Sequence, residues 1–143
     1  MSTHANIIIK ERGSKLYFYR HSDGYPEGVK PTLMKFLEWL KEGKIRNNIG
    51  QASGWLIMLG AIEYNTIPKF KVPEPSFEGG ILYGDIESIE NSDENDFMAW
   101  KVGAYEPTTA IHGDIVYLYT IDLEKKQIEV KQVYEDEVVA IWR

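Results

Sequence analysis

The fold follows from residues 6–20, which read NIIIKERGSKLYFYR. Asn6–Lys10 is a run of β-branched residues and Leu16–Arg20 is rich in aromatic residues, and both compositions favour strands. The stretch Glu11–Ser14 between them contains a glycine turn signal. We therefore expect a β-hairpin at this point of the chain.

Two helical patterns follow the hairpin. In Pro31–Glu42 the apolar residues recur at i, i+3, i+4 and i+7, and a proline suits the first turn of a helix. Ser53–Ile62 is apolar on nearly every side, and its length favours a buried helix over a strand. Gly54 and Gly60 lower the helical propensity of this second segment, but small residues also permit close packing.

The rest of the chain is rich in strand-forming residues. Four segments between turn signals are predicted strands: Met98–Tyr105, Ile115–Ile121, Gln127–Val133 and Val138–Trp142. The order of two strands, two helices and further strands is typical of the α+β class. We expect a single α+β domain over residues 1–143, with a twisted antiparallel sheet and two helices packed on one face.

Composition limits the classes of function. The chain has 143 residues and no cysteine, which excludes a disulfide scaffold, a thiolate zinc site and a cysteine nucleophile. No apolar run approaches the roughly 20 residues of a membrane span, and residues 1–6 lack the features of a signal peptide. These features predict a cytoplasmic protein with no membrane partner.

Charge is divided unevenly along the chain. Residues 1–71 carry a net charge of +5 and residues 72–143 a net charge of −11, within a total of −6. No lysine or arginine lies between Lys71 and Lys101, and we expect a flexible acidic loop near residues 84–97. An acidic stretch repels nucleic-acid phosphates and attracts basic proteins, so direct nucleic-acid binding is disfavoured. A solvated loop explains the same residues.

Reactive side chains are most frequent in two segments of the chain, Arg20–Pro26 and His112–Asp114. Each contains His-x-Asp beside a glycine and flanks a predicted strand. Residues two apart in an extended chain point to the same side, so the two segments together would present imidazoles and carboxylates. That set suits hydrogen bonding to a ligand, a metal ion or acid/base chemistry. Turn-forming aspartates and surface histidines are the plainer interpretation.

We expect these segments to form a ligand-binding site together with nearby aromatic rings. An arginine would pair with an anion, and tyrosine or tryptophan rings would stack on a base, although core packing also explains such rings. The expected site residues are Arg20, His21, Asp23, Tyr25, Trp100, Tyr105, His112 and Asp114. The sequence contains no phosphate loop, dinucleotide fingerprint or nucleophile elbow, and no catalytic residue, metal or cofactor is predicted.

Residues 19–28, which read YRHSDGYPEG, and the following Pro31–Leu33 resemble small uncharacterised proteins of phages, prophages and other bacterial mobile elements. The shared features are a strand, an Asp-Gly-Tyr-Pro turn and an amphipathic helix. Residues 52–57 and the segments near Trp100 and His112 resemble the same proteins. The resemblance implies an accessory factor that acts against or alongside host systems, and it names no catalytic residue.

Three functions remain open at this point. The first is a non-enzymatic binding protein for a small anionic or nucleotide-like ligand, for example a host-defence antagonist that sequesters a host immune signal. The second is an acidic inhibitor of a host nucleic-acid-binding or defence protein. The third is a metal-dependent hydrolase built on the two His-x-Asp segments. The exposed edges of a small sheet also make a homodimer reasonable.

Overall fold

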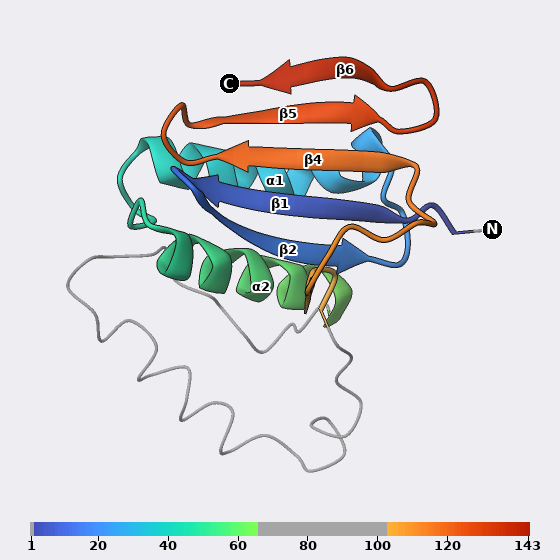
Figure 1. Cartoon of the computed structure of the whole chain (residues 1–143). Coiled ribbons are helices and arrows are strands. Elements are labelled where there is room, and N and C mark those ends of the chain that lie inside the picture. The colour runs from blue at the N-terminus through green and yellow to red at the C-terminus, as the bar shows by residue number, and fades with distance from the viewer. Residues whose placement is uncertain (1, 66–102) are drawn as a thin grey trace, which may run out of the picture.

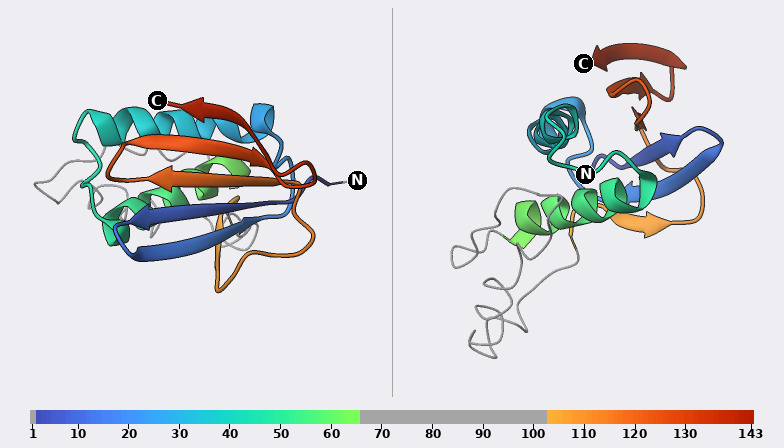
Figure 2. Two further views of the ribbon diagram at one scale, coloured as in Figure 1. Left: turned by 45° about the horizontal axis from the view of Figure 1, so that its top comes forward. Right: turned by 90° about the vertical axis from the view of Figure 1, so that its left-hand side faces the viewer.

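The computed structural model describes residues 2–65 and 103–143, which form two helices and one six-stranded sheet. The elements, in chain order, are β1 (Ala5–Glu11), β2 (Ser14–Arg20), α1 (Pro26–Lys41), α2 (Ile49–Asn65), β3 (Glu106–Thr108), β4 (Tyr117–Asp122), β5 (Gln127–Gln132) and β6 (Glu137–Trp142). The strand order is β3-β2-β1-β4-β5-β6, as Figure 1 shows. Both helices lie on the same side of the twisted sheet (Figure 2).

The α+β class is confirmed, but the sheet is mixed and not wholly antiparallel. β1 pairs in parallel with β4, with Ala5 opposite Tyr117, whereas the other neighbouring strands are antiparallel. The alternation of residues in a strand determines which face each side chain takes and leaves the direction of the neighbouring strand open. The sequence pattern therefore predicted the strands without predicting this parallel pair.

Two element boundaries differ from the sequence prediction. α1 begins at Pro26, five residues before the expected Pro31, so Pro26 occupies the first turn and Pro31 lies inside the helix. The strand expected at Met98–Tyr105 falls mainly outside the described residues, and its described end is not in a strand. Instead β3 pairs with residues 17–19 of β2.

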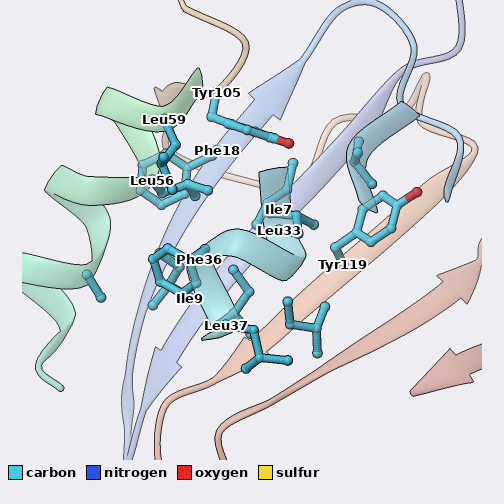
Figure 3. Packing of buried hydrophobic residues seen from close by; sticks show 14 of the residues in the cluster. Ile7, Ile9, Phe18, Leu33, Phe36, Leu37, Leu56, Leu59, Tyr105 and Tyr119 are labelled. Atoms are coloured by element: carbon cyan, nitrogen blue, oxygen red, sulfur yellow. The ribbon is translucent and has the colours of Figure 1, made fainter. Parts of the chain in front are cut away.

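The hydrophobic core fills the space between the sheet and the helices. Alternate residues of each strand point toward the helices because side chains alternate between the two faces of a sheet. Burying each such side chain contributes roughly 1.5–3 kcal/mol. Figure 3 shows the centre of this core, made by Ile7, Ile9, Phe18, Leu33, Phe36, Leu37, Leu56, Leu59, Tyr105 and Tyr119.

Two expectations from the sequence concern other parts of the chain. The predicted acidic loop near residues 84–97 and the site residue Trp100 lie outside the described residues. Neither α1 nor α2 is long and apolar enough to cross a membrane.

Candidate ligand site: a histidine–tyrosine cluster

The three histidines of the chain meet at the ring of Tyr19, near the end of β2. The imidazole of His112 stacks on this ring with 4.0 Å between centroids, and that of His21 meets it edge-on at 4.5 Å. The imidazole of His4 stacks more distantly, at 5.8 Å. Together with the carboxylates that contact them, these groups form the histidine–tyrosine cluster: His4, Tyr19, His21, Glu106, His112 and Asp114.

Strand alternation places Tyr19 on the face of the sheet that carries no helix. Its neighbours Phe18 and Arg20 face the core and α2, so the Tyr19 side chain points the other way. Asn6, opposite Tyr19 in the β1–β2 register, is fully buried beside it. The Oδ1 atom of Asn6 accepts a hydrogen bond from the backbone N–H of His112 at 2.7 Å. This contact holds residues 109–116 against β1.

Asp114 links the cluster to the N-terminal segment. Its Oδ2 atom accepts a hydrogen bond from the Tyr19 hydroxyl at 2.8 Å and lies 3.8 Å from Nε2 of His4. The backbone N–H of Val116 donates to the carbonyl of His4 at 2.9 Å. Three segments far apart in the sequence therefore converge on one small region.

The electrostatics of the cluster give Tyr19 and Asp114 different protonation states at neutral pH. Burial raises the pKa of Tyr19 to about 12, with further contributions from the hydrogen bond to Asp114 and from the charges of Asp114 and Glu106. The same hydrogen bond lowers the pKa of Asp114, helped by the nearby His4. Tyr19 is thus a protonated donor and Asp114 an ionised acceptor, and neither is suited to remove a proton from a substrate.

In each of the three imidazoles, the Nε2 atom is the one that contacts another side chain of the protein. Nε2 of His21 lies 2.9 Å from Oε1 of Glu106, and Nε2 of His112 lies 2.8 Å from Oγ1 of Thr108. Within residues 2–65 and 103–143, no hydrogen bond reaches Nδ1 of either ring, and Nδ1 of His4 is buried without a partner. A buried polar atom without a partner is rare in folded proteins. Nδ1 of His21 belongs to a side chain that is 60% exposed, so this nitrogen is available to another molecule.

Of the expected site residues, the structure brings His21, His112 and Asp114 together and places Arg20 and Tyr105 elsewhere. Arg20 is only 2% exposed and lies on the helix side of the sheet, with Nη2 2.6 Å from Oε2 of Glu63. Its Nη1 donates to the Tyr105 hydroxyl at 3.1 Å, and its Nε donates to a loop carbonyl at 2.7 Å. All three guanidinium nitrogens are therefore occupied within the protein.

The expectation that Arg20 offers its charge to an anion is corrected by this geometry. Burial alone lowers the pKa of Arg20, but the hydrogen bond to Glu63 and the charges nearby raise it overall. The guanidinium stays charged and has its counter-ion inside the fold. The aromatic rings that contact the guanidinium also belong to the protein: its central carbon lies 5.5 Å from the ring centroid of Tyr64 and 5.3 Å from that of Tyr105.

Asp23 and Tyr25 lie in the turn before α1. Asp23 adopts a positive φ of 54°, and its charge raises the pKa of the nearby Tyr25 phenol. A Cβ atom on Gly28 would lie 2.2 Å from the carbonyl oxygen of Asp23, so the first turn of α1 packs directly on this residue. Among the described residues, no hydrogen bond, ion pair or ring contact joins either side chain to the histidine–tyrosine cluster.

Sequence reasoning missed three members of the cluster: His4, Tyr19 and Glu106. The one available signal was strand alternation, because Phe18 in the core places Tyr19 on the opposite face.

The described residues contain no group of three or more histidine, aspartate or glutamate side chains placed to hold a metal ion. The two His-x-Asp segments therefore form no metal-ligand set in this part of the chain.

Comparison of the chain with models of known protein families, with characterised proteins and with solved structures found no match.

Proposed function

We propose that this chain is a non-enzymatic binding protein whose histidine–tyrosine cluster receives a small anionic ligand, such as a nucleotide or another phosphate ester. The observation that supports the proposal is the convergence of three imidazoles on Tyr19 from three separate segments. Each imidazole has a ring nitrogen that no described residue engages. Imidazole N–H groups are good donors to phosphate oxygens, particularly when the ring is protonated.

The charges of the cluster make this binding dependent on pH. With neutral imidazoles, the carboxylates of Glu106 and Asp114 give the region a negative charge that repels an anion. A protonated imidazole carries a positive charge, so protonation of His4, His21 and His112 would reverse that balance. We therefore expect the ligand to bind more tightly at pH 5.5 than at pH 8.

A flat ring for stacking is also present in the cluster. The side chain of His21 is 60% exposed, whereas the ring of Tyr19 is covered by its neighbours. The exposed imidazole is the surface on which a nucleobase would stack, in place of the Tyr25, Trp100 and Tyr105 rings expected from the sequence. A nucleotide would thus use His21 for its base and the other ring nitrogens for its phosphate.

The biological setting of this proposal rests on the sequence alone. The resemblance of residues 19–28 to phage and mobile-element proteins suggests a host-defence antagonist. Sequestering a nucleotide-like immune signal of the host is a role for which binding without catalysis suffices. The competing acidic-inhibitor hypothesis concerns residues 74–96, which lie outside the described residues.

Thermal-shift and calorimetric titration with inorganic phosphate, AMP, ADP-ribose and a cyclic dinucleotide test the proposal. We expect at least one of these anions to bind, with affinity about tenfold weaker in a His21→Gln variant, which corresponds to about 1.4 kcal/mol. Tyr25→Phe is the matched control, because Tyr25 lies outside the cluster and should leave affinity unchanged. The proposal is wrong if none of the four anions binds at pH 5.5, or if only the Tyr25 variant loses affinity.

A further inference from the structure

The two edge strands of the described sheet differ in length and in proline content. β3, at one edge, has three residues and contains Pro107, and a short strand with proline is poorly suited to further pairing. β6, at the other edge, has six residues that read EVVAIW, without proline or glycine. Figure 1 shows β6 as the outermost strand of the described sheet.

β6 also exposes apolar side chains along this edge of the described sheet. Val138, Val139 and Ile141 are 45%, 48% and 43% exposed, although the strand holds its end in the core through Trp142. A bulge lies in this region, since Ala140 pairs with Val130 but Val138 pairs with the next residue of β5. Natural proteins usually cover an apolar edge strand of this kind, because its free backbone groups invite another strand.

We propose that β6 pairs antiparallel with β6 of a second copy of the chain, about a two-fold axis at Ala140. In this register Val139 lies opposite Ile141 of the second copy, so the exposed apolar side chains cover one another. Glu137 lies opposite Arg143 of the second copy, and both residues are exposed. The pairing thus joins opposite charges at both ends, and such cross-strand pairs stabilise a sheet.

A second copy fits this edge better than a head-to-tail arrangement of many copies. Head-to-tail growth needs β6 of one copy to pair with β3 of the next, and β3 is too short and contains Pro107. Pairing of β6 with itself is isologous and closes after two chains. The two sheets become one continuous sheet with all helices on the same face, and the histidine–tyrosine cluster contributes no residue to the contact.

The absence of cysteine makes a direct test possible. In the proposed register the Ala140 Cα atoms of the two copies lie about 4.5–5.5 Å apart, which is within the span of a disulfide. The Ala140→Cys variant of the full chain should therefore form a disulfide-linked dimer on mild oxidation. Tyr134→Cys is the matched control, because residue 134 is 76% exposed but lies far from the two-fold axis.

Light scattering of the unmodified chain supplies the second readout. We expect a mass of two chains, and a mass of one chain for Ile141→Lys with an unchanged far-ultraviolet circular dichroism spectrum. Three results would each overturn the proposal: a monomeric unmodified chain, equal cross-linking of the two cysteine variants, or a dimer that persists in Ile141→Lys. If Ile141→Lys does not fold, the comparison of the two cysteine variants still tests whether β6 pairs with β6 of a second copy.

Discussion

The imidazole of His112 lies nearly parallel to the phenol ring of Tyr19, with 4.0 Å between the ring centroids and 21° between the planes. The contact connects β2 with the segment that leads into β4, although these parts are far apart in the sequence. A protonated imidazole over an aromatic ring adds an electrostatic attraction to the stacking. The contact is therefore both part of the candidate site and part of what holds the segment 109–116 in place.

Replacing Tyr19 with phenylalanine separates these two roles. Tyr19→Phe keeps the ring on which the histidines pack and removes the hydrogen bond to Asp114. We expect the free energy of unfolding to fall by about 1–2 kcal/mol, less than the full value for a hydrogen bond to a charged group because Asp114 is open to solvent. Urea denaturation measures the change, and Tyr17→Phe on the same strand is the control. Equal effects of the two variants would contradict the assigned role of the Tyr19 hydroxyl.

The stability of the fold should decline in alkali through its buried tyrosines. The pKa of Tyr19 is raised to about 12, while a tyrosine in an unfolded chain titrates near 10. The protonated phenol is the form the fold favours, so its contribution is complete below about pH 10 and is lost as the pH rises through about 12. Burial also raises the pKa of Tyr105 and of Tyr119.

Absorbance of tyrosinate measures this effect directly. At pH 11 the folded chain should show fewer ionised tyrosines than the nine in its sequence, and urea should release the remainder. Full ionisation of all nine near pH 10, without unfolding, would show that these phenols are not buried as described.

Removing Glu63 should destabilise the fold strongly. Glu63 is the counter-ion of the buried Arg20 and accepts a hydrogen bond from Thr32. Glu63→Ala leaves the buried guanidinium without its counter-ion, and we expect a loss of about 3 kcal/mol in the free energy of unfolding, the lower end for breaking a buried ion pair because Glu63 is partly exposed. The exposed pair of Lys35 and Glu38 provides the control, since Glu38→Ala should change stability little. A small effect of Glu63→Ala would mean that Arg20 is open to solvent.

Two of the three glycines of α2, Gly54 and Gly60, should respond oppositely to alanine. A Cβ on Gly54 would meet nothing within 4 Å, so Gly54→Ala should stabilise the fold by up to about 1 kcal/mol through helix propensity. A Cβ on Gly60 would lie 2.7 Å from Cδ2 of Tyr105 and 3.0 Å from its backbone nitrogen, so Gly60→Ala should destabilise it. Thermal unfolding of both variants checks the pair, and a stabilising Gly60→Ala would contradict the described packing.

Local sequence signals predicted the elements well and their arrangement less well. The hairpin of residues 6–20 and the existence of both helices follow from propensity and periodicity, which act over short stretches. The start of α1 was misplaced because Pro26 and Pro31 both suit a first helical turn, and the sequence alone does not choose between them. The parallel pairing of β1 with β4 depends on how distant segments pack, which no local pattern contains.

The same distinction applies to the candidate site. The sequence singled out His21 and His112, and the structure brings both rings to Tyr19. It assigned Arg20 to a ligand because an arginine beside a polar turn looks available, while its counter-ion Glu63 lies in another element. Tyr19 was read only as a strand residue, because its role depends on side chains that the fold brings from elsewhere.

The central claim is that the histidine–tyrosine cluster binds a small anionic ligand, and NMR of the imidazole rings tests it most directly. The chain has three histidines, so each ring C–H resonance can be assigned with single variants and followed during titration with the four anions at pH 5.5. The account predicts saturable shifts of the His21 and His112 resonances with at least one anion, weakening at pH 8. Unmoved histidine resonances with every anion, in a folded protein, would contradict it.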